Sequence, residues 1–512
     1  MKKNILFQSA IVLLVVLSTA CSKSDVVSDS STTTGSTSSS SSNSIDSAFT
    51  TGTAEGNTDS AYNADDLLAN STFSNTVTIT FGSSVTVSNP LSGSGVTITT
   101  SGNDVTITST VSSVAYVVSG TTTNGSVKLY SDNKYKLTLS GANITNSDGP
   151  AINIQSKKRG FIVLADGTTN TLTDGSTYAT ATNSEDQKGT LFAEGQIIFS
   201  GSGNLTVKGN YKHAIASDDY VRITSGTITI SGATKDAIHT NDAFIMDDGT
   251  LNLTASDDGI QIDEGYAVIN NGTINITSVG KGITASYDST DATITPYLTI
   301  NGGTFNITST DEGIESKSLL TINKGNLTIK SGDDAINAGT ALYINGGRTY
   351  AYSTGNDAMD SNGILTITGG LNVAIGSKSP EASFDCDART FKITGGNLIG
   401  IAGATSGPTS SVSTIYSVVM GSGSANQIMH VESSDGTEVF TFLAPISFST
   451  LIYASSKLSS GKTYNVYTGG SVSSGTSFNG LYTSGTYSGG SLSTTFTTSS
   501  KVTQIGGSIS RG

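Results

Sequence analysis

A glycine followed by a short alternating strand recurs along the middle of the chain. Successive glycines are about 22–23 residues apart, a period typical of a repeat architecture, with one long step from Gly272 to Gly303 and a slightly longer last step. A second landmark, a small residue followed by Ile or Met, repeats with nearly the same steps and has its long step from Gly282 to Gly313. Agreement between two separate series indicates a structural repeat. The landmark glycines are at positions 203, 226, 249, 272, 303, 325, 347, 370 and 396.

Each repeat contains a third short strand before the glycine, such as Leu320-Thr321-Ile322. Alternate residues in all three strands are Ile, Val, Leu or Ala, which is the pattern of strands with one buried face. A repeat this short holds three strands and three turns, but not a strand and a helix. We therefore expect an all-β protein, a right-handed parallel β-helix with about 22–23 residues and three strands per coil. The 59 glycines and the many Ser and Thr residues argue against a mainly helical protein.

Stacking of the coils at about 4.8 Å aligns equivalent residues in columns. One column contains only asparagines, and we expect their amides to form a hydrogen-bonded ladder. The long step predicts a loop inserted around residues 286–296, and the open ends of the solenoid require caps from the flanking segments. The asparagines of this column are Asn270, Asn301, Asn323 and Asn345.

The ends of the chain differ from this repeat. Residues 1–20, with Lys2, Lys3 and a short apolar run, followed by Cys21, resemble a bacterial lipoprotein signal, although Leu17 is four rather than three places before the cysteine. The alternative is an ordinary secretory signal. We expect a lipidated Cys21 and a disordered Ser/Thr-rich tether over 21–71, the β-helix over 72–404, and a small antiparallel β-module over 405–512. The expected location is an exported lipoprotein at the outer membrane or cell surface.

The formal net charge of −14 makes nucleic acid an unlikely partner. An acidic surface instead suits divalent cations. Two cysteines make no disulfide framework, and a monomer is expected.

Acidic residues collect just before the small–Ile pair in successive coils, so that carboxylates stack along one edge. Two carboxylates about 5 Å apart repel by roughly 1 kcal/mol in water, and a hard cation such as Ca²⁺, which takes six to eight oxygen ligands, removes that cost. The alternative is that these residues only form turns on a solvated corner. The candidate metal ligands are Asp236, Asp257, Asp258, Asp263, Asp311, Glu312, Asp333 and Asp334.

The strings around these turns resemble one family, the bacterial cell-surface carbohydrate-binding β-helix proteins. The resemblance implies calcium at the acidic turns, binding of cellulose- or pectin-type polysaccharides, and a pectate-lyase-like architecture, generally without lyase activity. The chain departs from the family pattern at Lys281, which replaces an acid, and at Asn356-Asp357, which is one acid short. The strings are Asp257-Asp258-Gly259-Ile260, Asp311-Glu312-Gly313-Ile314 and Asp333-Asp334-Ala335-Ile336.

Three functions remain open: a non-catalytic polysaccharide-binding protein, which we favour, a calcium-dependent lyase acting by β-elimination, and a structural adhesin. A lyase would need a base, for which Lys235, Lys281 and Lys317 are the candidates. His213, His239 and His430 show no ligand spacing and are interpreted as polar surface residues. The candidate sugar contacts near the acidic edge are His239, Gln261, Glu315, Lys317 and Asn337.

Overall fold

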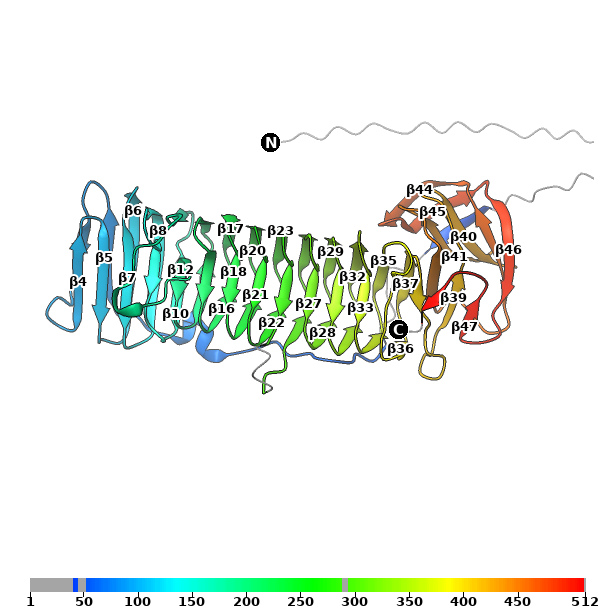
Figure 1. The fold of residues 1–512 in the computed structure, drawn as a ribbon, viewed down its shortest axis with the longest axis horizontal. Helices are drawn as coiled ribbons and strands as arrows, with labels where there is room; N and C mark the ends of the chain where they lie inside the picture. Colours follow the sequence, from blue (N-terminus) through cyan, green and yellow to red (C-terminus); the bar gives the residue numbers. More distant parts are fainter. Residues whose placement is uncertain (1–39, 45–51, 288–292, 511–512) are drawn as a thin grey trace, which may run out of the picture. The chain divides into compact units, whose positions relative to one another are not determined.

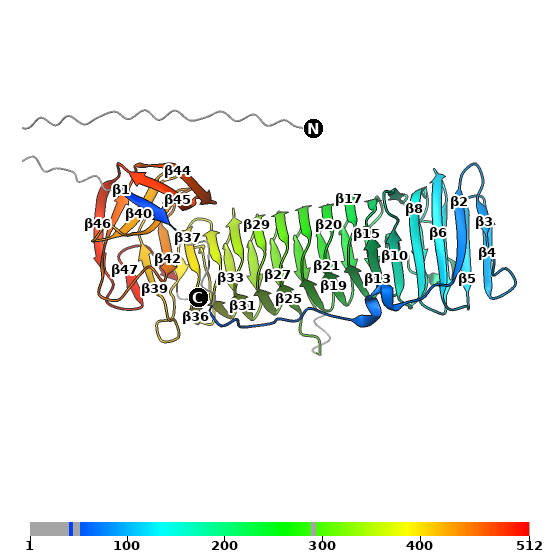
Figure 2. The ribbon, with the colours of Figure 1, turned by 180° about the vertical axis from the view of Figure 1, so that it is seen from behind.

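The computed structural model describes residues 40–44, 52–287 and 293–510. This part of the chain is all-β, with a β-solenoid of about 13 turns and an antiparallel sheet near the C-terminus (Figures 1 and 2). The predicted fold class is confirmed. Helical structure within it is limited to three short 3₁₀ turns, η1 (Ala64–Asp66), η2 (Leu68–Asn70) and η3 (Thr182–Ser184), so none of its helices is long and apolar enough to cross a membrane. The expected signal and Cys21 lie outside the described residues.

Three columns of parallel strands wind around the solenoid axis, as the repeat predicts. The first column contains β2 (Asn75–Phe81), β6 (Val114–Thr122), β8 (Tyr135–Thr145), β10 (Gly160–Leu164), β13 (Ile197–Gly201), β16 (Tyr220–Ile223), β19 (Ala243–Met246), β22 (Tyr266–Ile269), β25 (Tyr297–Ile300), β28 (Leu319–Ile322), β31 (Ala341–Ile344), β34 (Ile364–Ile367) and β36 (Phe391–Ile393).

The second column begins at the C-terminal half of β8, with which β11 pairs, and most of its strands start just after a landmark glycine. It contains β11 (Thr169–Thr173), β14 (Asn204–Gly209), β17 (Thr227–Ala233), β20 (Thr250–Ala255), β23 (Thr273–Ser278), β26 (Thr304–Thr308), β29 (Asn326–Ser331), β32 (Arg348–Ser353), β35 (Leu371–Ile375) and β37 (Asn397–Ala402).

The third column is a 12-stranded sheet whose strands are mostly three residues long. It contains β4 (Val96–Ser101), β5 (Asp104–Ser109), β7 (Ser126–Ser131), β9 (Ile152–Ile154), β12 (Gly189–Ala193), β15 (His213–Ser217), β18 (Ile238–Thr240), β21 (Ile260–Ile262), β24 (Ile283–Ala285), β27 (Ile314–Ser316), β30 (Ile336–Ala338) and β33 (Met359–Ser361).

The core lies inside the coils, where the inward Ile, Val, Leu and Phe side chains of the three columns form one continuous apolar cluster. Eight of the nine landmark glycines, all except Gly203, have positive φ. At Gly249, with φ 105°, a Cβ would also lie 2.7 Å from the carbonyl oxygen of Gly226 in the preceding coil. Only glycine fits this turn, which explains why the repeat is visible in the sequence.

Antiparallel strands end the solenoid on both sides. At the N-terminal end β4 pairs antiparallel with β5, and β3 (Thr86–Ser88) pairs antiparallel with β2. At the other end β42 (Thr450–Ser455) pairs antiparallel with β37 and with β39 (Tyr416–Met420), and β47 (Val502–Gln504) lies parallel to β39. A short parallel pair, β38 (Thr405–Ser406) and β48 (Ile509–Ser510), completes this end.

The remaining C-terminal strands form a seven-stranded antiparallel sheet, which we call the C-terminal module. One of its strands comes from the other end of the sequence, because β1 pairs with β45. The strands are β1 (Ser40–Ser44), β40 (Ile428–Ser433), β41 (Glu438–Leu443), β43 (Thr463–Thr468), β44 (Ser471–Phe478), β45 (Leu481–Ser488) and β46 (Ser491–Thr497).

The predicted asparagine ladder is present: Asn301, Asn323 and Asn345 each donate to the carboxamide oxygen of the preceding coil over 2.8–2.9 Å, and Asn270 donates to the Asp247 carboxylate at 2.9 Å. The amides also donate to the backbone carbonyls of residues 52–71, which we call the N-terminal strap. Asn345 donates to Glu55 at 2.7 Å and Asn323 donates to Asn57 at 2.9 Å. The strap thus runs along the coils from β34 back to η1 (Figure 2).

The strap corrects the expectation that the whole of 21–71 is a disordered tether. Its polar residues contribute little apolar burial, but the ladder amides satisfy four of its backbone carbonyls, those of Glu55, Asn57, Asp59 and Ser60. The strap also carries Asp66, which is 1% exposed and accepts hydrogen bonds from Arg159 at 2.8 Å and Arg222 at 3.2 Å. A charge-assisted pair of this kind holds polar chain in place where composition alone predicts disorder.

Candidate functional site

The turns that precede the strands of the third column carry the predicted stack of ionisable residues, which we call the acidic edge. Parallel pairing from β15 to β33 keeps these turns in register, so equivalent side chains lie above one another. The residues immediately before the small–Ile pairs are His213, Asp236, Asp258, Lys281, Glu312, Asp334 and Asp357.

The middle of the acidic edge is neutralised by lysines. Lys281 Nζ lies 3.2 Å from Glu312 Oε1 and 2.5 Å from Glu315 Oε2, and Lys317 forms a second ion pair with Glu315. Burial alone would raise the pKa of Glu315, but Lys281 and Lys317 lower it below its usual value. Thr284 also donates to Glu315 at 3.0 Å. Glu315 is therefore a structural anion here.

The predicted ligands Asp311, Glu312 and Asp333 come together, with carboxylate oxygens within 4.8 Å of one another. Burial raises the pKa of Glu312 to about 7, and its Oε2 is buried with no hydrogen-bond partner among the described residues. An orphaned carboxylate oxygen beside two further carboxylates fits a hard cation such as Ca²⁺.

A second carboxylate cluster lies at the C-terminal end of the acidic edge, where the sequence seemed one acid short. Asp357, Asp360 and Asp385 bring oxygens within 4.8 Å of one another. Burial, together with the charges of Asp334 and Asp357, raises the pKa of Asp360 to about 8. Burial also raises the pKa of Asp357 to about 7. No lysine or arginine of the described residues forms an ion pair with these carboxylates, so this cluster also fits a hard cation.

A third cluster consists of His213, Asp236 and His239. Asp236 Oδ2 lies 3.1 Å from Nδ1 of His213 and 3.0 Å from Nδ1 of His239. The interpretation of the histidines as surface residues is wrong for His213 and His430, which are 2% and 0% exposed. The missed signal was the spacing from 213 to 236, which is one coil.

The other predicted ligands do not assemble into one site. Asp257 lies 3.7 Å from Lys235 in an exposed ion pair. Burial raises the pKa of Asp258 to about 7, and its Oδ1 accepts from the Lys281 backbone N–H at 2.6 Å. Asp334 Oδ2 accepts from Asn337 at 2.9 Å, and burial raises its pKa to about 6.

Two of the predicted sugar contacts, Asn337 and Gln261, form hydrogen bonds with neighbouring side chains. Asn337 donates to Asp334 and Asp360, each at 2.9 Å, and Gln261 donates to Asp263 at 3.0 Å. Lys281 does not suit the role of a base either. Although burial disfavours its charged form, Glu315 and Glu312 hold the pKa of Lys281 above its usual value.

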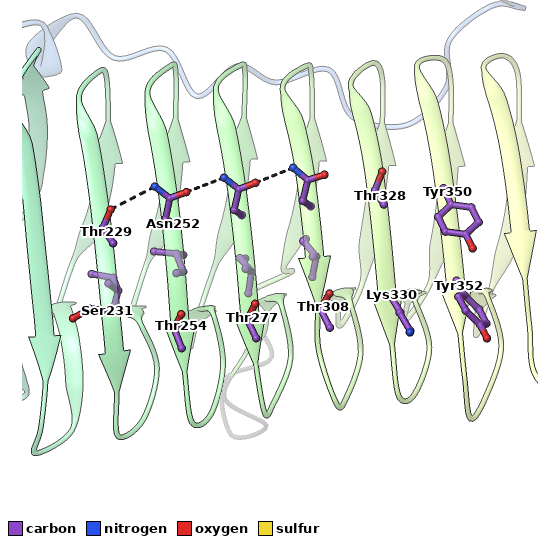
Figure 3. A pocket seen from close by; sticks show the side chains of 16 residues that line it. Thr229, Ser231, Asn252, Thr254, Thr277, Thr308, Thr328, Lys330, Tyr350 and Tyr352 are labelled. Atoms are coloured by element: carbon purple, nitrogen blue, oxygen red, sulfur yellow. Dashed lines mark hydrogen bonds between the residues drawn. The ribbon is translucent and has the colours of Figure 1, made fainter. Parts of the chain in front are cut away.

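A groove of about 740 Å³ lies elsewhere, over the outer face of the second column from β17 to β32 (Figure 3). Its middle contains a second asparagine ladder, in which Asn306 donates to Asn275 and Asn275 donates to Asn252, each over 2.8 Å. Asn252 continues the chain to Thr229 at 3.4 Å. The row beside this ladder is formed by Ser231, Thr254, Thr277, Thr308, Lys330 and Tyr352.

One end of the groove is aromatic. Tyr350 and Tyr352 lie on β32 and pack against the apolar core that the C-terminal module shares with the last coils. Lys330 Nζ is 5.6 Å from the ring centroid of Tyr352, and Arg348 lies over Phe478 of β44. The module therefore closes this end. The outward positions of the landmark strands, readable from their alternation, were the signal that could have located the groove.

Comparison with known proteins identifies the family. The model of the family described as "Carbohydrate-binding domain-containing protein" matches residues 101–358, 268–382 and 294–424. A protein of the same description from Acetivibrio thermocellus is 32% identical over 112 residues, which are 21% of this chain and 39% of that protein. The chain thus spans about two fifths of the length of this relative.

A solved structure, titled as the polysaccharide lyase-like protein from C. thermocellum in a gadolinium derivative, is also similar. Its TM-score is 0.36 at 25% sequence identity, and the match covers 57% of this chain and 96% of that one. The family-model matches together extend from residue 101 to 424, which is more than half of the chain. The chain belongs to the carbohydrate-binding domain-containing protein family.

Proposed function

We propose that the protein binds an extended polysaccharide along the groove of the second column. The observation that carries this proposal is the row of amides and hydroxyls that ends in Tyr350 and Tyr352. Membership of the carbohydrate-binding family supports it. A regular ladder presents the same donors at every coil, about 4.8 Å apart, which is close to the length of one pyranose in an extended chain.

The chemistry of the groove suits sugar hydroxyls and ring faces. A carboxamide has two N–H donors, and the ladder through Asn252, Asn275 and Asn306 uses one of each, which leaves capacity for a hydroxyl acceptor. Tyrosine combines an apolar ring with a polar tip, as a pyranose face requires. The lining contains one cation, Lys330, and no carboxylate, so it accepts a neutral glycan or one with few acidic groups.

We further propose that Ca²⁺ binds at the acidic edge and stiffens the stack. Asp311, Glu312 and Asp333 would hold one ion, and Asp357, Asp360 and Asp385 would hold another. When bound, the ions neutralise carboxylates that otherwise repel each other. The carboxylates contribute the oxygens, and the register of the coils fixes their separation.

The proposed location is the cell surface, with Cys21 lipidated after removal of residues 1–20. The basic start and the short apolar run before Cys21 support this proposal. Replacing Cys21 by Ser should release the protein from the membrane fraction. Retention of C21S in that fraction would contradict the lipid anchor.

The test of polysaccharide binding is co-sedimentation with microcrystalline cellulose and chromatography with soluble polygalacturonate. We expect the native chain to bind at least one of them and Tyr352→Ala to weaken binding up to about tenfold, since stacking on one ring contributes about 0.5–1.5 kcal/mol. Tyr287→Ala is the matched control, because Tyr287 is 43% exposed and lies outside the groove. An equal loss in both variants, or no binding to any polysaccharide, would refute the proposal that the groove binds polysaccharide.

The same chromatography separates the alternatives. A polymer that shortens with time would make the protein a lyase. Calcium-dependent melting with no polysaccharide bound would make it a structural adhesin.

A further inference from the structure

His213, Asp236 and His239 form a cluster unlike the rest of the acidic edge, because two of its three groups are imidazoles. His213 starts β15, and the other two residues belong to the next coil, so the cluster connects two coils. The ligand atoms lie within 4.8 Å of one another. This donor set differs from the all-oxygen clusters further along the edge, which suit Ca²⁺.

His213 supplies a second, independent observation. It is 2% exposed, its Nε2 has no hydrogen-bond partner among the described residues, and its Nδ1 meets only Asp236 Oδ2, at 3.1 Å. Its ring stacks on that of His239 with centroids 4.1 Å apart, and both rings present Nδ1 to the same oxygen of Asp236. Two buried imidazoles thus share one carboxylate oxygen while a ring nitrogen of His213 stays unpartnered, which is costly unless a ligand completes the cluster.

Hydrogen-bonding groups around the cluster hold the His239 ring and the Asp236 carboxylate in fixed orientations, as such groups do for metal ligands. Nε2 of His239 lies 3.2 Å from Asp263 Oδ2, so a carboxylate holds the ring on the side away from Asp236, an arrangement that is common behind metal-bound histidines. The other oxygen of Asp236 accepts from the Asp258 backbone N–H at 3.2 Å, so Oδ2 is turned toward the imidazoles.

The distances fit a small cation with nitrogen ligands. Bonds of about 2.0–2.1 Å in tetrahedral geometry place ligand atoms roughly 3.3 Å apart. The two nitrogen–oxygen distances of 3.0 and 3.1 Å are close to this value. Turning both lone pairs onto one ion requires rotation about χ2 of the imidazoles, which is a soft torsion.

We propose that His213, His239 and Asp236 bind one divalent transition-metal ion of the zinc type, with a water in the fourth position. The ion ties the coil of β15 to the coil of β18. Imidazole nitrogen selects such ions over Ca²⁺, which prefers oxygen. This site is separate from the proposed calcium clusters and does not depend on polysaccharide binding.

The test is titration of the metal-stripped full chain with Co²⁺, followed by visible absorption, and then displacement by Zn²⁺. We expect one tetrahedral Co²⁺ per chain, which excess Ca²⁺ does not displace. The double variant H213N/H239N should lose this signal, and Asp263→Asn should weaken affinity about 10–100-fold because it removes the carboxylate behind His239. Glu264→Gln is the matched control, because Glu264 is an exposed acid next to Asp263, and this variant should bind as the native chain does.

Three results would overturn the proposal: no stoichiometric tetrahedral signal in the native chain, a signal that persists in H213N/H239N, or displacement by Ca²⁺. Asp263 is 44% exposed at its side chain, so Asp263→Asn keeps the fold and tests the site even where the double variant does not fold. The Co²⁺ titration does not measure polysaccharide binding. It therefore tests the metal site even if the groove binds no polysaccharide.

Discussion

The middle and the C-terminal end of the acidic edge carry carboxylates at equivalent positions of the repeat, but they neutralise them differently. In the middle, Lys281 and Lys317 pair with Glu315, whose pKa is lowered below its usual value. At the end, Asp357 and Asp360 have no such partner among the described residues, and burial raises the pKa of Asp360 to about 8. The middle region contains its own cations beside Glu315, and the C-terminal region has none among the described residues.

The comparison shows that the repeat determines where a carboxylate lies, and that the nearest side chain determines whether it is neutralised. Register places a side chain at the same point of every coil, but whether a carboxylate is a structural anion or a metal ligand depends on a lysine one coil away. Lys281 thus neutralises Glu315 and one oxygen of Glu312, which leaves Asp311, Asp333 and the other oxygen of Glu312 for a metal ion, whereas the C-terminal cluster has no such internal cation among the described residues.

The largest effect is expected from Lys281→Met. It leaves Glu315 with one cation and Glu312 with none, and breaking a buried pair costs on the order of 3 kcal/mol. Chemical denaturation should show the corresponding loss in the free energy of unfolding. Lys235→Met, at an exposed pair, should change it by less than about 0.5 kcal/mol. Equal effects of the two changes would show that the buried Lys281 pairs stabilise the fold no more than an exposed pair does, and would contradict the self-neutralised middle region.

The next effect is that of pH without calcium. The pKa is raised to about 7 for Asp258, Glu312 and Asp357, and to about 8 for Asp360. An acid with a raised pKa keeps its proton in the folded chain after the unfolded chain has lost it, so stability falls as pH rises from the ordinary pKa to the raised one and levels off above it. His239, raised to about 9, has the same sign, because its stabilisation is present below 6.5 and is lost as pH rises through 9.

The melting temperature in chelator should therefore fall by several degrees from pH 6.5 to 8, and calcium should reduce the fall. The window begins at 6.5 because burial lowers the pKa of His213 and His430 to about 4, which gives the opposite slope below it. A melting temperature that rises with pH across this window would contradict the assignment.

A smaller effect is expected from Asp360→Asn in chelator at pH 8. The amide still accepts from Asn337 but carries no charge, so we expect stabilisation by about 1 kcal/mol. The calcium-induced rise in melting temperature should also shrink. Asp132→Asn, an exposed acid of an earlier coil, should change neither quantity. Destabilisation by D360N would show that its charge is already compensated in the metal-free protein.

The smallest effect is expected from Lys317→Met. Lys317 is 44% exposed at its side chain, and Glu315 keeps Lys281, so the loss should be below about 1 kcal/mol. Thermal melting at low and high salt measures it. A loss as large as that of Lys281→Met would make the two lysines equal contributors.

The regular part of the fold was predictable because each coil repeats the same steric demands. The glycine of positive φ, the alternating strand and Asn301 or Asn323 in the ladder recur at fixed steps, so the sequence alone shows the period. The strap was not predictable, because its stability comes from side chains that lie far away along the chain, as Asn345 does from Glu55.

The candidate sites were predictable only in part. Asp311, Glu312 and Asp333 gather as the column predicts, because they occupy successive coils at one corner. The groove was not predicted because the outward residues of a single strand are ordinary polar residues. They form a groove only where several successive coils carry them at the same position. The histidine cluster was not predicted. The spacing from His213 to Asp236 is one coil, but the sequence does not show that the His213 side chain is buried.

The strap also has a mechanical consequence. Its backbone runs along the solenoid axis, whereas the ladder amides of Asn270, Asn301, Asn323 and Asn345 hold it from the side. A pull on the strap along the axis from its residue 52 end loads these bonds in shear and in parallel, so they must yield together. The strap thus distributes a tensile load over several coils, each of which otherwise contacts only its neighbours in the stack.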